Sequence, residues 1–257
     1  MKNKKRHSPK VKNSGLLRLT NETHNIEKLL MDNLIGLDDT FKFDSSKNSR
    51  MCKGHAGNTL YPYDIYAMSK ALKLTTQEFM DKYCETYISL PASLVPLVRF
   101  KTVGTENKCP MLENGQCKVC ENKPLICSTY PLSVFVAAKE DGTALSGYLL
   151  NKSATSPVGK TYTVREWLSR NDVDEKDEFT SDFVTTYEIV KEILSPEELT
   201  EIPRPLLKPL TDTIFKFLYS GYDTSIDFST QFLANKQELL ELCIQIIEEK
   251  IKNEEEV

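Results

Sequence analysis

Residues 109–131 read CPMLENGQCKVCENKPLICSTYP and hold four of the chain's seven cysteines, Cys109, Cys117, Cys120 and Cys127. Three prolines and Gly115 exclude a long helix here, so the helices must lie on either side. A thiolate is a soft anionic ligand, and four of them suit either Zn²⁺ or an iron–sulfur cluster. The C-x7-C-x2-C-x6-C spacing therefore predicts a metal site, with redox-active or free thiols and unligated buried cysteines as the alternatives.

The composition is that of an ordinary globular protein with enough apolar residues for a core. Its net charge of -4 gives no attraction to nucleic acid. No window approaches the ~18 apolar residues of a membrane span. The basic N-terminus lacks the apolar region of a secretory signal, so we expect a cytoplasmic protein. Cytoplasmic thiols stay reduced, and the odd number of seven cysteines also disfavours a disulfide framework.

The chain divides by composition into a tail and one domain. Residues 1–20 carry many basic and no acidic residues, which predicts a disordered basic tail. Residues 21–257 are expected to form a single domain, with a cysteine-cluster half over 38–150 and a helical half over 158–257. Apolar residues at helical spacing predict a helix from Thr20 to Leu37, and the polar stretch 41–58 is expected to be a loop.

Two helices are predicted between residues 62 and 86, where Thr75 and Glu78 form a capping box. LSVFVAA and ALSGYLL, separated by a stretch containing Asp141-Gly142, predict a β-hairpin. Helical patterns follow in VREWLSR, in FTSDFVTTYEIVKEIL, from Leu210 to Tyr219, and from Phe228 to Lys252. The expected fold is mostly α with a small antiparallel β hairpin or sheet. In this α+β fold the cysteine cluster joins the N-terminal helix pair to a proline-rich loop.

The remaining candidates carry weaker signals. Cys52 lies in the polar loop three residues before His55, where a ligand role and a spectator role are equally open. Cys84 and Cys243 lie on apolar faces and are expected to be small buried hydrophobes. Asp64 is expected to be a helix cap or surface residue. The VGKT stretch at 158–161 lacks the earlier glycine of a phosphate-binding loop.

A family resemblance adds to this reading. The pattern C-P-x-L-x-x-G-x-C-x-V-x-x-x-x-P-x-x-C-x-x-Y-P resembles the second half of cysteine-cluster proteins described as zinc- or iron-chelating domains, a group that includes the flagellin lysine N-methylases. The stretch LYPYDIYAMSKALKLTTQEF resembles that family after its first cysteine group. TVREWL and YDTSIDF resemble its C-terminal half. The resemblance covers roughly residues 38–245.

By position, the resemblance implies the metal ligands Cys52, Cys109, Cys117 and Cys127. Cys120, which stands where the family has an aromatic residue, and His55 are weaker candidates. Relatives also carry cysteines where this chain has Asp44, Ser45 and Met51. The resemblance therefore implies fewer bound metal ions than in the relatives, or none.

The predicted function is that of a metal-binding protein of undetermined activity, holding either an iron–sulfur cluster or Zn²⁺. The alternative implied by the resemblance is an enzyme that transfers methyl groups from S-adenosylmethionine to protein lysines, with a protein substrate as partner. The sequence identifies no catalytic residue for such a reaction and does not indicate an oligomeric state.

Overall fold

The computed structural model describes residues 32–44, 52–53, 59–88, 95–138, 144–175, 178–194 and 204–255. Within these segments helices combine with small antiparallel sheets, which confirms the predicted α+β fold. The basic tail at 1–20, His55 and most of the predicted helix over 20–37 lie outside the described residues. The end of that predicted helix is wrong, because Leu34–Ile35 form strand β1.

The predicted helix pair is present as α2 (Pro62–Leu72) and α3 (Thr76–Tyr83). The capping box is confirmed: the Glu78 carboxylate accepts a hydrogen bond from the backbone N–H of Thr75 at 2.8 Å. Ile65, Met68 and Phe79 are fully buried, as the helical spacing predicts. The pair ends earlier than predicted, because residues 84–87 leave the helix and form a strand.

This strand belongs to a three-stranded antiparallel sheet that the sequence patterns did not reveal. Its order is β3 (Thr59–Leu60), β5 (Leu97–Phe100) and β4 (Cys84–Tyr87). The prediction of one small sheet is therefore too simple. Alternate residues of β5 are buried against the helices, which is the half-buried pattern of an antiparallel strand.

The predicted strand pair is confirmed by β8 (Leu132–Ala138) and β9 (Ala144–Leu150), which pair in register from Leu132 opposite Leu150 to Ala138 opposite Ala144. The Asp141-Gly142 turn predicted between them lies outside the described residues. Strand β1 adds to the other edge of β9. A second pair joins β2 (Thr40–Phe43) to β10 (Lys160–Thr163). The start of the predicted loop 41–58 is thus wrong, because Phe41 and Phe43 alternate inward from a strand.

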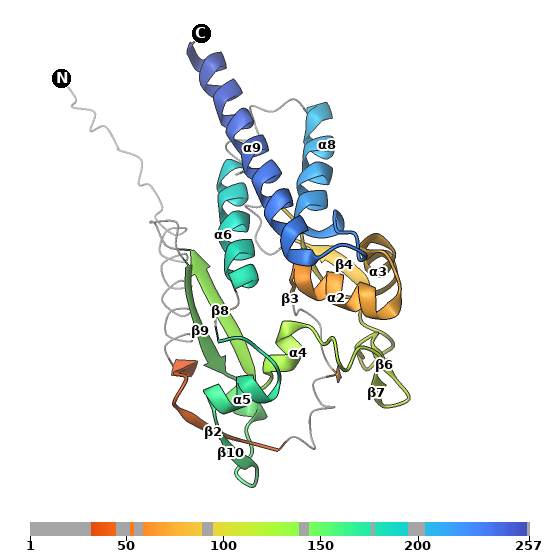
Figure 1. Ribbon diagram of the computed structural model, residues 1–257, viewed down its shortest axis with the longest axis vertical. Helices are drawn as coiled ribbons and strands as arrows, with labels where there is room; N and C mark the ends of the chain where they lie inside the picture. The colour runs from red at the N-terminus through yellow and green to blue at the C-terminus, as the bar shows by residue number, and fades with distance from the viewer. Residues whose placement is uncertain are drawn as a thin grey trace, which may run out of the picture.

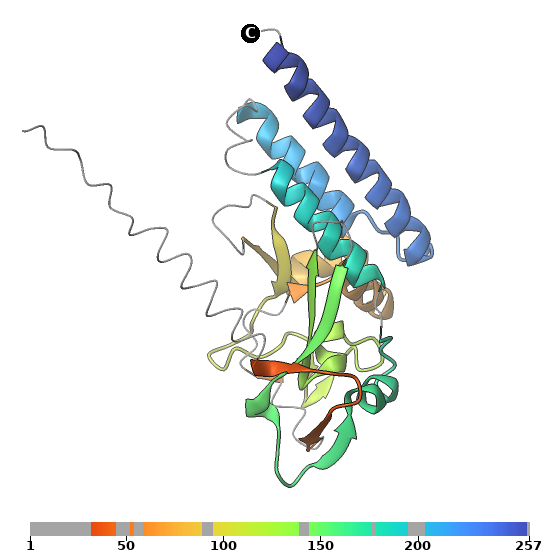
Figure 2. The ribbon, with the colours of Figure 1, turned by 90° about the vertical axis from the view of Figure 1, so that its left-hand side faces the viewer.

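The predicted C-terminal helices are present as α5 (Val164–Arg170), α6 (Glu178–Ile193), α8 (Arg204–Phe215) and α9 (Phe228–Glu255). A π-helical turn, η3 (Lys216–Ser220), continues α8 and carries the buried Tyr219. In Figures 1 and 2, α6, α8 and α9 rise together at one end of the molecule, and α9 extends farthest.

Two hydrophobic cores organise the described chain. The main core lies between the helix pair, the β3–β5–β4 sheet and α6, α8 and α9, and it includes Leu60, Ile65, Phe79, Met111, Val119, Leu194, Ile214 and Leu239. The second core lies around α5 and the strand pair β2–β10, and it comprises Ile35, Phe41, Phe43, Leu132, Tyr148, Tyr162, Val164, Trp167 and Leu168. Each core takes residues from both predicted halves, 38–150 and 158–257.

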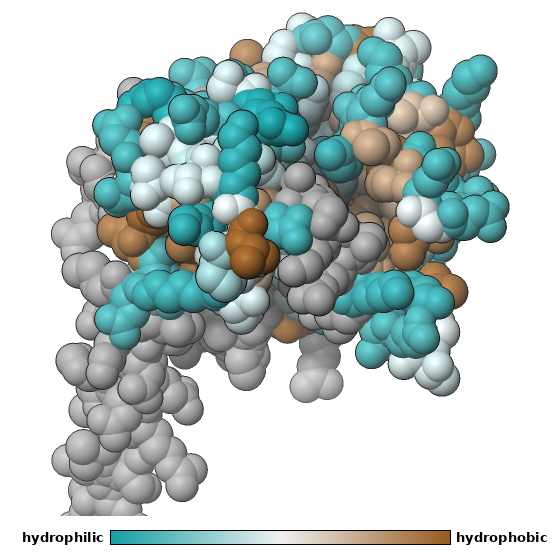
Figure 3. All heavy atoms as spheres, turned by 90° about the horizontal axis from the view of Figure 1, so that it is seen from below, coloured by the Kyte–Doolittle hydropathy of each residue, from teal (hydrophilic) through white to brown (hydrophobic). Residues whose placement is uncertain are grey.

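At the lower end of the molecule in Figure 1, hydrophobic side chains lie in separate groups among hydrophilic ones (Figure 3). None of the helices in the described segments combines the length and apolar character that crossing a membrane requires.

Candidate metal centre

The cysteine segment begins with a tight hairpin. Strand β6 (Leu112–Glu113) pairs with β7 (Gln116–Cys117), and Asn114 and Gly115 between them have φ values of 52° and 79°. Two successive residues with positive φ define the type I′ turn that suits two-residue hairpins, and Asn-Gly is its preferred sequence. Asn114-Gly115 is the local signal from which this hairpin could have been predicted. The hairpin places Cys117 opposite Leu112.

Cys52 reaches this hairpin from a distant part of the chain. The backbone N–H of Cys109 donates to the carbonyl oxygen of Cys52 at 2.9 Å. An antiparallel bridge between Lys53 and Lys108 extends the contact. Two segments that are more than fifty positions apart in the sequence are therefore joined at the two cysteines.

Cys127 lies on the short helix α4 (Leu125–Thr129), which is held at both ends. At the first end, Oδ1 of Asp64 accepts from the backbone N–H of Leu125 at 2.8 Å. At the other end, the indole N–H of Trp167 donates to the carbonyl oxygen of Thr129 at 3.0 Å. Asp64 belongs to the first turn of α2 and Trp167 to α5, so α4 connects the two cores.

The electrostatics show that the four predicted ligands are neighbours. Burial raises the pKa of Cys127 well above its usual range, and repulsion from the Asp64 carboxylate and from Cys109, Cys52 and Cys117 in their ionised forms raises it further. The thiols therefore come together from the Cys52 segment, the β6–β7 hairpin and α4.

The pKa values of Cys109 and Cys52 are shifted in the same direction. The pKa of Cys109 is raised to about 11 by burial, against hydrogen bonds from the backbone of Met111 and Leu112, and the charges of Cys52 and Cys117 add to the rise. Burial and Cys117 also raise the pKa of Cys52, whereas Lys123 lowers it. Lys123 is thus a positive charge close to the thiol group.

Cys120 differs from these four cysteines. Its side chain is exposed, while its neighbour Val119 is buried in the main core. Cys120 is not among the groups that shift the pKa of Cys52, Cys109 or Cys127. Cys84 and Cys243 are 5% and 2% exposed in the main core, as their apolar surroundings predicted.

Among the described residues, no group of three or more His, Cys, Asp and Glu side chains is arranged so that it could hold a metal ion. The thiols of Cys52, Cys109, Cys117 and Cys127 are neighbours, but not a preassembled ligand set. Their type nevertheless fits a thiolate-bound ion, since sulfur is a soft donor and Lys123 favours the ionised form of Cys52.

Asp64 has a second contact beyond the helix cap that its sequence context predicts. It caps α2 as expected, because its Oδ2 accepts from the backbone N–H of Tyr61 at 2.9 Å. It is also 5% exposed and in contact with the cysteine segment. An acidic residue in the first turn after Tyr61-Pro62 signals the cap, but no local pattern reveals a partner 61 positions away.

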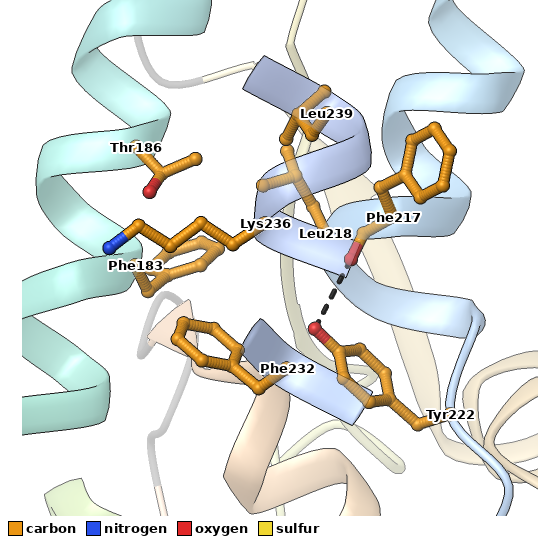
Figure 4. A pocket seen from close by; sticks show the side chains of 8 residues that line it. All are labelled: Phe183, Thr186, Phe217, Leu218, Tyr222, Phe232, Lys236 and Leu239. Carbon is orange, nitrogen blue, oxygen red and sulfur yellow. Dashed lines mark hydrogen bonds between the residues drawn. The ribbon is translucent and has the colours of Figure 1, made fainter. Parts of the chain in front are cut away.

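A cavity lies between α6, η3 and α9 (Figure 4). Apolar side chains line most of it, and Lys236 crosses from α9 to pair with Asp182 on α6 at 2.7 Å. The dashed line in Figure 4 marks a second polar contact of the lining, in which the Tyr222 hydroxyl donates to the Phe217 carbonyl at 3.1 Å. Its volume of about 10 Å³ is on the order of one water molecule. We therefore interpret it as a packing defect rather than a cofactor pocket.

A second cavity of about 10 Å³ lies beside the β8–β9 hairpin, between Leu125 and the residues Asp174 and Glu175. It too has room for about one water molecule. Neither cavity favours S-adenosylmethionine binding.

No protein-family model, curated protein or solved structure matches the chain. The resemblance to the cysteine-cluster family gains no support from these comparisons, and the case for a metal site is made by the residues themselves.

Proposed function

We propose that the protein binds one metal centre through the thiolates of Cys52, Cys109, Cys117 and Cys127. The observation that carries the proposal is the hydrogen bond that joins Cys109 to Cys52, beside the hairpin of Cys117 and the Asp64-held helix of Cys127. The effects of the four thiols on one another's pKa values support it. A cytoplasmic location belongs to the same proposal, because reducing conditions keep the thiols free to bind metal.

The donor set favours Zn²⁺ or an iron–sulfur cluster over hard ions such as Mg²⁺ and Ca²⁺. Four thiolates around Zn²⁺ leave no position open for a substrate, which is the arrangement of a structural site. An iron–sulfur cluster would instead supply electron transfer. In either case Cys109 and Cys117 bring the hairpin, Cys127 brings α4, and Cys52 brings the segment before α2.

Metal analysis of protein prepared without oxygen tests the proposal. We expect close to one zinc ion, or one cluster with visible absorption, for each chain. Parent protein that holds no metal under these conditions, and takes up neither Zn²⁺ nor a reconstituted cluster, would refute it.

Methyl transfer from S-adenosylmethionine to protein lysines remains the alternative proposal, and it rests on the family resemblance alone. Incubation with labelled S-adenosylmethionine and candidate surface proteins tests it. Label in a lysine of the substrate protein would support the methyltransferase. The same labelling by metal-free enzyme would show that methyl transfer does not depend on the metal site.

A further inference from the structure

Asp64 joins two structural elements that the proposed metal site needs together. Its carboxylate is buried on α2 and accepts two backbone hydrogen bonds, from Tyr61 at 2.9 Å and from Leu125 at 2.8 Å. Tyr61 precedes α2, and Leu125 begins α4, the helix that carries Cys127. Asp64 also lies close enough to Cys127 for its charge to act on the thiol.

We infer that Asp64 is a positioning residue that fixes α4 against α2 and so presents Cys127 to the other three thiols. This inference rests on the proposed function, because positioning matters for binding only if the thiols hold a metal. Residues that orient metal ligands in this way commonly change metal affinity by about 10–100-fold when they are replaced.

The chemistry at this position requires a carboxylate. Two N–H donors converge on the side chain, and an ionised carboxylate offers only acceptors. An amide has a single acceptor oxygen, and its NH₂ group would face one of the donors. Asp64→Asn therefore keeps the shape of the side chain but leaves one of the two N–H groups without its partner.

Glu78 supplies a matched control on the neighbouring helix. Its carboxylate also accepts the backbone N–H of a helix-capping residue, Thr75, at 2.8 Å. Unlike Asp64, it is exposed, and its hydrogen bonds stay within the α3 cap. Glu78→Gln thus perturbs a helix cap without releasing α4.

The experiment compares Asp64→Asn with Glu78→Gln in the full chain, using two measurements. The first is Zn²⁺ affinity by competition with a chromophoric chelator. The second is the rate at which iodoacetamide modifies each cysteine of the metal-free protein, followed by mass spectrometry. We expect Asp64→Asn to weaken Zn²⁺ binding by roughly tenfold or more and Glu78→Gln by less than about twofold.

In the alkylation experiment we expect Asp64→Asn to speed the modification of Cys127 and to leave Cys84 and Cys243 at the parent rates. A uniform rise at every buried cysteine would mean general destabilisation and would overturn the positioning role. Unchanged Zn²⁺ affinity, or an unchanged Cys127 rate, would overturn it as well. If the parent protein binds no Zn²⁺, the proposed function fails, and the Cys127 rates of two variants that keep the Asp64 charge then decide whether Asp64 positions α4.

A second pair of variants removes the same hydrogen bond without changing Asp64. Leu125→Pro deletes the N–H donor, and the extended backbone of Pro124, with φ −61° and ψ 153°, already suits a following proline. Leu125→Ala removes side-chain packing but keeps the donor. We expect Leu125→Pro to speed the alkylation of Cys127 as Asp64→Asn does. Leu125→Ala should leave that rate at the parent value. Equal behaviour of the two Leu125 variants would overturn it.

Discussion

At the scale of single residues, the seven cysteines divide by their surroundings. Cys84 and Cys243 are packed in the main core, Cys120 is exposed, and the four proposed ligands are half-buried and close together. Spacing along the sequence does not show which of Cys117 and Cys120 is the better candidate ligand. The structure distinguishes them, because Cys117 ends the hairpin and is partly buried, whereas Cys120 is exposed beside the buried Val119.

Cys127→Ser and Cys117→Ser are each expected to lose the metal and to lower the melting temperature. The free energy of metal binding by thiolates contributes to the free energy of folding, so loss of a ligand also destabilises the fold. Metal content measured without oxygen and thermal unfolding by circular dichroism check both effects. Parent-level metal content in the variants of all four proposed ligands would show that these residues are not ligands.

Two variants serve as controls for these ligands. Cys120→Ser is expected to keep the metal, because the side chain is exposed and does not affect the pKa of Cys52, Cys109 or Cys127. Cys243→Ser should also keep it, at a cost of about 1–2 kcal/mol for a buried hydroxyl without a partner. Loss of metal from Cys120→Ser together with its retention in Cys52→Ser would mean that the site lies wholly within the 109–127 segment.

Metal affinity is expected to rise with pH. In the metal-free protein burial raises the pKa of Cys109 to about 11 and raises that of Cys127 still more strongly, so both thiols are protonated at neutral pH. A bound cation must displace these protons. Calorimetry of Zn²⁺ binding in buffers of different ionisation enthalpy should show proton release between about pH 6 and pH 8. An affinity that does not change over this range would argue against thiolate ligands.

At the scale of elements, the sequence predicts best where a repeated local signal coincides with burial. The α2–α3 pair has a capping box and buried residues at helical spacing, and the β8–β9 hairpin joins two apolar runs of equal length. Strands β2, β3 and β5 have at most four residues each. Periodicity in so few residues is weak, and their partners are distant in the sequence, so tertiary packing determines them.

The candidate site follows the same rule. The ligand residue types and the lack of a long helix follow from the 109–131 stretch alone. The approach of Cys52 depends on a hydrogen bond between Cys109 and a residue far away, and the role of Asp64 depends on one to Leu125. Neither contact leaves a local pattern.

The glycine of the VGKT stretch, Gly159, is required by close packing on β2 and needs no phosphate ligand to explain it. A Cβ atom at this position would lie 2.6 Å from the carbonyl oxygen of Phe43, in the paired strand β2. Gly159→Ala is therefore expected to push β10 away from β2 and to cost at least roughly 1–3 kcal/mol in the free energy of unfolding. Urea denaturation measures this cost.

Gly147→Ala is the matched control, because its Cβ would meet only the end of the Leu34 side chain at 3.6 Å. It should change the free energy of unfolding by less than about 0.5–1 kcal/mol. If the two alanine variants were equally stable, close packing of β10 on the Phe43 backbone could not be the reason for the glycine.

At the scale of the whole molecule, buried thiols make stability depend on alkaline pH. Cys84 has a pKa of about 12 in the folded protein because it is buried, against an ordinary value of 9.0. Its thiol contributes stability that is fully present below pH 9 and is lost as the pH rises toward 12, since only the unfolded chain ionises freely there. The loss reaches up to roughly 1.4 kcal/mol per pH unit.

The difference in unfolding free energy between the metal-free parent and Cys84→Ala isolates this contribution, because lysines and tyrosines titrate in both proteins. We expect the difference to be constant below pH 9 and to shift in favour of the alanine variant above it. A difference that stays constant up to pH 11 would show that Cys84 ionises equally in the folded and unfolded states.

The proposed metal site would also affect the cooperativity of the whole fold. Cys109 and Cys117 pack against the main core, whereas α4 leads from Cys127 to β8 and α5 of the second core. A metal bound by Cys109, Cys117 and Cys127 would add a link between the cores to the hydrogen bonds of α4 and to the packing of α6 on β8 and β9. The second core is the smaller of the two and buries less apolar surface, so it should unfold first when that link is absent.

The chain's single tryptophan makes this testable, because Trp167 lies in the second core while α2, α3, α6 and α9 pack on the main core. In urea, tryptophan fluorescence reports the second core, and far-ultraviolet circular dichroism reports mainly the main-core helices. We expect the two transitions to coincide in the metal-loaded protein and the fluorescence transition to come first after chelation. Coincident transitions in the chelated protein would mean that α6 and the hydrogen bonds of α4 are enough to couple the two cores without metal.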